Sequence, residues 1–206
     1  MLINNKSINM ITHNEYILAS TSASRKRILK NAGFPFKQVK PLCNEKKIKD
    51  SLKNKHPAMV AKRLSYEKAK SVSLNKKFNK KKIIGCDTLI YLDKKIFDKA
   101  KNIKEASTKL RALSGKKHKI VTGMTICYDG KKIWQCSSTT EVMVRKLNNK
   151  QIGVYLKKAG KQILQSVGCY QIEGLGPNII QEIKGDFFNV MGLPLFKLIK
   201  YTSLNK

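Results

Sequence analysis

The sequence predicts an α/β fold built around one mixed β-sheet. Short apolar strands and amphipathic helices alternate through the first half of the chain, as they do where strands run parallel. Two long strands then flank Asp129 and Gly130, a dipeptide that suits a two-residue hairpin turn and therefore an antiparallel pair. The 206 residues, 41% of them apolar, are enough to form a single core without disulfides or metal.

The first half of the chain contains four predicted elements. They are a buried strand at Tyr16–Ala19, a helix at 22–32, a long helix at 57–72 and a central strand at Lys82–Leu92. Gly33 ends the first helix, and Pro57 suits the first turn of the second. The strand at Lys82–Leu92 is too apolar for an edge position, and Gly85 predicts a kink in it.

The second half contains five predicted elements. They are a helix after Asn102, strands at 120–128 and Lys131–Val144, a helix at 151–158 and a C-terminal helix from Pro194. Asn102 stands three residues before Glu105, which is the spacing of a capping box. Residues 168–178 are rich in glycine and are predicted to form a loop.

The formal net charge of +30 raises the question of nucleic-acid binding. Only five of the 43 basic residues are arginine, and the 38 lysines are spread along the whole chain. Arginine is the usual residue for bidentate recognition of phosphate and bases. The composition therefore favours a general lysine bias over a dedicated nucleic-acid surface, although the charge still attracts anionic ligands such as nucleotides.

Cysteine usage and hydropathy indicate a cytoplasmic protein with no membrane partner. The five cysteines are an odd number without a C-x-x-C pair, which predicts neither a zinc site nor a disulfide framework. No apolar run approaches the roughly 20 residues that span a bilayer. Residues 1–14 lack the apolar centre of a signal peptide, so we expect a polar lead followed by a single domain at 15–206.

The segment ILASTSASRKRIL places a cluster of hydroxyl side chains where the first strand turns into the first helix. Free backbone N–H groups and the positive end of a helix dipole make such a turn a cradle for phosphate. The candidate ligands are Ser20, Thr21, Ser22, Ser24 and Arg25. The alternative is that Ser22 only caps the helix and Arg25 is solvated. The chain has no P-loop motif.

Asp87 is the most informative of the 13 acidic residues, because it continues a strand that should be buried. A buried carboxylate costs several kcal/mol unless a cation, a metal or a hydrogen-bond donor accepts it. A role in metal binding or water activation and a structural salt bridge are the two interpretations that the sequence leaves open.

Several segments, taken together, resemble the Maf family of nucleoside triphosphate pyrophosphatases. They include LASTSASRKRIL, GCDTLIYL, VGCYQIEG and GDFFNVMGLPL, and the resemblance extends from Ile17 to Leu198. It implies a long curved mixed sheet flanked by helices, with a nucleotide cleft between two lobes. It also implies cleavage of a nucleoside triphosphate to the monophosphate and pyrophosphate, with Mg²⁺ or Mn²⁺ as cofactor, to clear non-standard or surplus nucleotides.

The resemblance also implies roles for individual residues. The catalytic residues that it implies are Asp87, Glu45 and Lys99, with Asp87 as proton acceptor and Asp87 and Glu45 as metal ligands. The substrate-binding residues that it implies are Ser20, Ser22, Ser24, Arg25, Lys68, Thr88 and Glu173.

The preferred base stays open, because the positions tied to it are mixed. Thr88 resembles the group that acts on dTTP and UTP, Glu173 resembles the group that acts on 7-methyl-GTP, and Ser24 matches neither. The chain also lacks the proline and first arginine of the family's S-P-R-R, and has Asn44 where many members have an acid before Glu45. Similar proteins are often homodimers. The alternative function is a nucleotide- or nucleic-acid-binding regulator of cell division without turnover.

Overall fold

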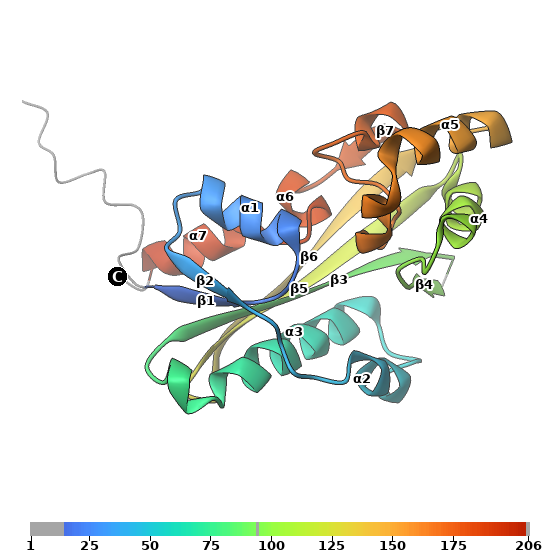
Figure 1. Cartoon of the computed structure of the whole chain (residues 1–206). Helices are drawn as coiled ribbons and strands as arrows, with labels where there is room; N and C mark the ends of the chain where they lie inside the picture. Colours follow the sequence, from blue (N-terminus) through green and yellow to red (C-terminus); the bar gives the residue numbers. More distant parts are fainter. Residues whose placement is uncertain (1–14, 94, 205–206) are drawn as a thin grey trace, which may run out of the picture.

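A seven-stranded mixed sheet forms the centre of the protein (Figure 1). The computed structural model describes residues 15–93 and 95–204, so the expected polar lead at 1–14 lies outside the described residues. The strands are β1 (Tyr16–Ala19), β2 (Phe36–Val39), β3 (Lys82–Leu92), β4 (Lys95–Phe97), β5 (Lys117–Tyr128), β6 (Lys131–Val144) and β7 (Ile180–Lys184). The order is β2-β1-β3-β5-β6-β7, with β4 beside β3. Because β1 is parallel to β2 and β3 and the other pairs are antiparallel, the prediction of a mixed sheet is confirmed.

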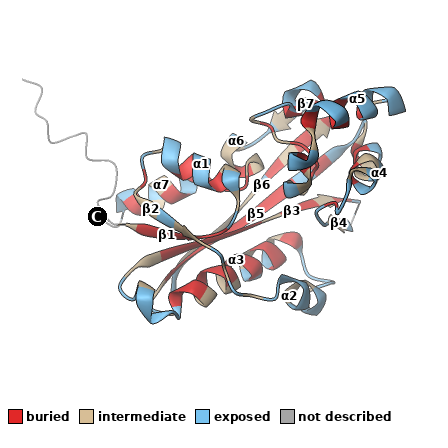
Figure 2. Cartoon of the chain, in the orientation of Figure 1, coloured by how far each residue is buried: buried red, intermediate tan, exposed pale blue. Residues whose placement is uncertain are grey.

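Helices cover both faces of the sheet. They are α1 (Ala23–Asn31), α2 (Glu45–Ser51), α3 (Pro57–Ser73), α4 (Ile103–Leu113), α5 (Asn149–Ala159), α6 (Phe187–Val190) and α7 (Leu195–Leu204). Figure 1 shows α3 along one face and α1 with α7 on the other, while α4 and α5 lie toward the far end of the sheet. In Figure 2 the buried residues of α3 face the sheet, whereas α2, which has no buried residue, is largely exposed.

The face of the sheet opposite α3 carries two separate hydrophobic clusters. One packs α1 and α7 against β1 and the first part of β3, and the other packs α4 and α5 against the ends of β3, β5 and β6. Side chains alternate along a strand, so Cys86, Thr88 and Ile90 of β3 point to this same face. Thr88 and its cross-strand partner Thr122 interrupt the apolar surface between the clusters. The gap between the two clusters therefore begins at this pair of threonines.

Gly85 lets α3 approach β3 closely. A Cβ atom at this position would lie 2.2 Å from the carbonyl oxygen of Ser65 and 2.9 Å from the Cβ of Ala69. The pairing of β3 with β5 continues through Gly85 without a register shift, so the expected kink is not seen as a break in the ladder. The glycine instead accommodates the helix, and this close packing brings the neighbouring α3 turn to the level of Asp87.

The long elements agree with the sequence prediction. Asp129 and Gly130 both have positive φ, 45° and 75°, as a type I′ hairpin turn requires. The predicted helices correspond to α1, α3, α4, α5 and α7. The short elements β2, α2, β4, α6 and β7 were not predicted from the sequence. None of the helices within residues 15–93 and 95–204 combines the length and apolar character needed to cross a membrane.

Candidate active site

A pocket of about 830 Å³ lies at the carboxyl end of β1. β1 pairs with β3 only as far as Gly85, and β4 pairs with β3 from Ile90 onward. Between these points no strand in the described part of the chain covers the edge of β3. Asp87 and Thr88, whose side chains point to opposite faces, therefore both border the pocket. The carboxyl end of a parallel strand is a usual place for ligand binding in open α/β sheets.

The turn from β1 into α1 forms one wall of the pocket. Ser22 is the N-cap of α1, and its Oγ accepts a hydrogen bond from the backbone N–H of Arg25 at 3.4 Å. Ser20 Oγ accepts from the N–H of Ser22 at 3.2 Å. The capping role expected for Ser22 is therefore confirmed, while the alternative of a solvated Arg25 is wrong, because Arg25 is only 8% exposed.

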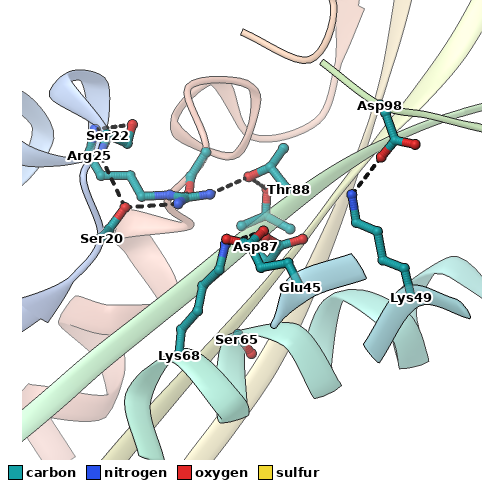
Figure 3. A network of polar contacts seen from close by, with 12 residues as sticks. Ser20, Ser22, Arg25, Glu45, Lys49, Ser65, Lys68, Asp87, Thr88 and Asp98 are labelled. Carbon is teal, nitrogen blue, oxygen red and sulfur yellow. Dashed lines mark hydrogen bonds and ion pairs between the residues drawn. The ribbon is translucent and has the colours of Figure 1, made fainter. Parts of the chain in front are cut away.

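The guanidinium of Arg25 is held by neutral oxygen atoms. Nε donates to the carbonyl oxygen of Gly192 at 2.7 Å, Nη1 to Ser20 Oγ at 3.0 Å and Nη2 to Thr88 Oγ1 at 2.9 Å (Figure 3). Gly192 has φ of 100°, and a Cβ there would lie 3.1 Å from Thr88 Oγ1. Since each terminal nitrogen carries a second N–H, two donors remain for a ligand.

Lys68 connects the two predicted catalytic acids. Its Nζ lies 2.6 Å from Asp87 Oδ1 and 3.1 Å from Glu45 Oε2 (Figure 3). The side chains of Lys68 and Asp87 are each 8% exposed, whereas that of Glu45 is 46% exposed. The salt bridge considered for Asp87 is thus present, and it includes a second carboxylate as well.

The pair of carboxylates suits a hard divalent cation. Mg²⁺ prefers oxygen ligands and is usually bound by one or two carboxylates, several waters and the phosphates of a substrate. Asp87 and Glu45 supply two carboxylates that converge on one point, now occupied by the ammonium of Lys68. The described residues include no group of three or more Cys, His, Asp or Glu that could form a complete protein cage. The donor set therefore fits a cation shared with a phosphate ligand.

Lys99 faces the same pocket from the loop after β4. Burial lowers the pKa of its ammonium, and the positive charges of Arg25 and Lys68 lower it further. Among the described residues it forms no ion pair or hydrogen bond. A partly buried cation that is destabilised by its neighbours is a favourable place for an anion to bind.

Glu173 also lines the pocket and is held by two side chains of α1. Its Oε1 accepts hydrogen bonds from Ser24 Oγ at 2.7 Å and Arg27 Nη2 at 2.6 Å. Ser24 and Glu173, two of the three positions that the resemblance connects with base choice, are therefore in direct contact. Thr88 is instead part of the Arg25 network, where its Oγ1 also lies 3.0 Å from Thr122 Oγ1.

All of the predicted site residues border this one pocket, from Ser20, Ser22, Ser24, Arg25, Glu45, Lys68, Asp87, Thr88 and Lys99 to Glu173. Arg27, Lys49 and Asp98 also line the pocket and were not predicted as site residues. Arg27 could have been found, because it lies three residues after Ser24 and so on the same helix face.

Lys49 and Asp98 form an ion pair at the mouth of the pocket. Lys49 Nζ lies 2.6 Å from Asp98 Oδ1 (Figure 3). Partial burial alone would lower the pKa of Lys49, but Asp98, with smaller contributions from Asp87 and Glu45, raises it. Lys49 lies one turn after Glu45 on α2, a helix whose sequence EKKIKDS has no apolar stripe to predict it. This explains why the pair was missed.

The fold and the pocket have the features of a site that holds a large oxygen-rich anion together with a divalent cation. Residues 15–203 match the family described as Maf-like protein. The chain belongs to this family.

Several curated relatives have similar length. A protein of Bartonella henselae named 7-methyl-GTP pyrophosphatase is 38% identical over 183 residues, which cover 89% of this chain and 91% of that protein. One of Rhodopseudomonas palustris named nucleoside triphosphate pyrophosphatase is 34% identical over 185 residues, covering 90% of this chain and 91% of the relative. A solved nucleoside-triphosphatase, or dITP/XTP pyrophosphatase, of Mycobacterium abscessus covers 63% of this chain and 72% of its own, with 12% identity and a TM-score of 0.32, too low to support an argument.

Proposed function

We propose that this protein hydrolyses nucleoside triphosphates to the monophosphate and pyrophosphate, with Mg²⁺ or Mn²⁺ as cofactor. One observation carries the proposal: Lys68 joins the carboxylates of Asp87 and Glu45 in the same pocket that contains Arg25 and Lys99. Acids that can hold a cation and cations that can hold a polyphosphate are the parts that phosphoryl transfer requires. The names of the relatives support this reading.

Binding of the triphosphate uses the positive wall of the pocket. The first turn of α1, capped by Ser22, offers backbone N–H groups and the positive end of the helix dipole. Arg25 offers its two remaining N–H donors, and Lys99 an ammonium without an ion-pair partner among the described residues. A triphosphate in this position would pair its negative charges with cations that lie close together in the free protein.

The chemical step needs an acid beside the attacked phosphorus. Asp87 and Glu45 would hold the divalent cation, which neutralises phosphate charge and makes water more acidic. In the proposed step, a water oxygen bonds to the α-phosphorus and Asp87 accepts its proton. The bond between the α-phosphorus and the bridging oxygen breaks, and pyrophosphate leaves with that oxygen and the electron pair.

A substrate panel tests the proposal. Purified protein is mixed with dTTP, UTP, 7-methyl-GTP and the common triphosphates, each with Mg²⁺ or Mn²⁺, and the products are separated. We expect equal amounts of pyrophosphate and nucleoside monophosphate, and none without a divalent cation. Release of orthophosphate in place of pyrophosphate would contradict the proposed bond cleavage. Tight, salt-sensitive binding of RNA or DNA with no turnover would favour the regulatory alternative.

Base preference is tested by the same panel with a Glu173→Gln variant. Glu173 is an acceptor whose oxygen is already oriented by Ser24 and Arg27. If this carboxylate contacts the base, its neutralisation changes the ratio of kcat/KM between 7-methyl-GTP and UTP. An unchanged ratio would place base recognition elsewhere in the pocket.

A further inference from the structure

The two acids of the pocket already have a cation, which is Lys68. Its Nζ contacts both carboxylates within 3.1 Å, and the side chains of Lys68 and Asp87 are almost fully buried, whereas that of Glu45 is partly exposed. A buried ammonium and a buried carboxylate stabilise each other strongly only as long as both stay paired. A metal ion that binds Asp87 and Glu45 must therefore compete with a cation belonging to the protein.

Displacement of Lys68 leaves an unbalanced positive charge in the pocket. Arg25 and Lys99 border the same pocket. Burial and the positive charges of Arg25 and Lys68 lower the pKa of Lys99, against smaller opposite contributions from Glu45 and Asp87, so these surroundings disfavour a further cation. A free divalent cation would add two charges to this cluster. A divalent cation that arrives with a triphosphate brings net negative charge, because the polyphosphate carries more charges than the ion.

We propose that Lys68 is an exchangeable counter-cation, so that the protein takes up the divalent cation together with the triphosphate and binds the free ion only weakly. Lys68 pairs with Asp87 and Glu45 in the free protein. It turns to the phosphates when the metal–triphosphate complex binds, and the two carboxylates then hold the metal. This inference rests on the proposed function, and it specifies the substrate as the metal–nucleotide complex.

The test measures Mn²⁺ binding by the electron paramagnetic resonance of free Mn²⁺, with no turnover involved. Mn²⁺ is titrated alone and with α,β-methylene-UTP or α,β-methylene-GTP, which cannot be cleaved at the proposed bond. Lys68→Met should bind Mn²⁺ alone at least ~10-fold more tightly than the wild type. The factor by which the analogue strengthens Mn²⁺ binding should be about 10-fold or more larger in the wild type than in Lys68→Met, within the usual range of coupling between ligands.

Two controls separate this effect from a general change of charge. Lys70→Met removes the same charge from α3 outside the pocket lining and should leave Mn²⁺ binding within about 2-fold of wild type. Lys99→Met removes a pocket cation that forms no ion pair with either acid, and should change Mn²⁺ binding to the free protein by less than about 3-fold. If Lys99→Met strengthened the binding of Mn²⁺ alone as much as Lys68→Met, the proposed exchange would be refuted, because the positive charge of the pocket would explain both effects.

Lys68→Arg provides a second test of the inference in case Lys68→Met folds poorly. Arginine preserves the charge and binds carboxylates through a planar fork, so Mn²⁺ alone should bind no more tightly than to the wild type. Tighter binding to Lys68→Arg, or equal binding of Mn²⁺ alone to all variants, would overturn the inference. If all variants bind Mn²⁺ equally and the wild type releases pyrophosphate, the counter-cation role of Lys68 is refuted and the proposed function stands. If the variants show the expected differences in Mn²⁺ binding but the wild type releases no pyrophosphate, only the proposed function is refuted.

Discussion

Arg25 and Lys68 are two buried cations of one pocket, and they differ in what surrounds them. They are 8% and 7% exposed, so burial does not distinguish them. Arg25 donates to one carbonyl and two hydroxyl oxygens, all neutral. Lys68 donates to two carboxylates. The positive charge of Arg25 is therefore available to bind an anion. The charge of Lys68 is neutralised by Asp87 and Glu45 as long as these carboxylates bind no other cation.

The two sides of the pocket are therefore expected to have different roles. The Arg25 side is a fixed framework, since Gly192, Ser20 and Thr88 belong to separate segments that the guanidinium ties together. The Lys68 side is an ion-pair cluster whose partners can be exchanged. A change on the first side should lower stability, and a change on the second should lower turnover.

The largest expected effect comes from the acid on the Lys68 side. Asp87→Asn removes the proposed proton acceptor and one of two carboxylates, so kcat should fall at least ~100-fold, the scale of a positioned acid or base. Glu67→Gln removes one negative charge from α3 outside the pocket lining and should leave kcat near that of the wild type. The measurement is steady-state release of pyrophosphate, together with circular dichroism to check the fold. Near-normal turnover in Asp87→Asn would remove this residue from the mechanism.

A third titratable side chain, His118, extends the comparison, because it is buried and its hydrogen-bond partner within the described residues, Tyr170, is neutral. It is 1% exposed, and its Nε2 lies 2.7 Å from the hydroxyl of Tyr170, which borders the pocket. Burial lowers the pKa of His118 to about 4. Arginine keeps its proton in such surroundings, whereas histidine loses it.

His118 should make the protein less stable in mild acid. His118 of the unfolded chain binds a proton near pH 6.5, whereas His118 of the folded chain binds one only near pH 4. The free energy of unfolding therefore keeps its full value above pH 6.5 and falls by up to about 3 kcal/mol as the pH decreases toward 4. His118→Gln can keep a hydrogen bond to Tyr170 without titrating. Urea unfolding at pH 7 and at pH 5 should therefore show a smaller loss of unfolding free energy for His118→Gln. Equal losses in both proteins would mean that His118 does not titrate in this range.

The framework role of Arg25 predicts a loss of stability. Arg25→Met leaves three buried or half-buried oxygens without their donor, so the free energy of unfolding should fall by about 2 kcal/mol. Arg25→Lys keeps the charge but not the planar fork, and should lose about half as much. Lys26→Met, an exposed neighbour on α1, controls for the change of net charge. If Arg25→Met lowers only substrate binding and not stability, the contrast with Lys68 is wrong.

The smallest effect is expected at the exposed mouth of the pocket. The Lys49–Asp98 pair links α2, which has no buried residue, to the segment before Lys99, but the side chain of Asp98 is 75% exposed. Such pairs contribute at most about 1 kcal/mol. Asp98→Asn should therefore lower kcat by no more than about 5-fold, through looser placement of Glu45.

A double-mutant cycle measures the pair directly. Asp98→Asn, Lys49→Met and the double variant are compared in kcat and KM at low and high salt. The double variant should be no worse than the more affected single one, and the difference should shrink at high salt. Additive losses would mean that Lys49 and Asp98 act on the substrate separately.

The long elements could be predicted because their signals are local. The apolar run of β3, the caps of α1 and α4 and the Asp129–Gly130 turn each depend on residues close together in the chain. Most of the pocket residues outside the first turn of α1 were predicted through the resemblance to a family. The short polar helix α2 gave no such signal. Lys49 was therefore missed, although its neighbour Glu45 was identified through the resemblance to a family.

The sequence alone determined the long elements, since hydrophobic periodicity and capping are properties of neighbouring residues, and the resemblance to a family added most of the charged residues of the pocket. The tertiary structure decided the partners. Whether Asp87 faces water, metal or lysine depends on the packing of α3 against Gly85, and whether Arg25 is solvated depends on Gly192, 167 residues away. Electrostatic pairing is set by distances between segments far apart in the chain, and those distances exist only after the sheet and helices have packed.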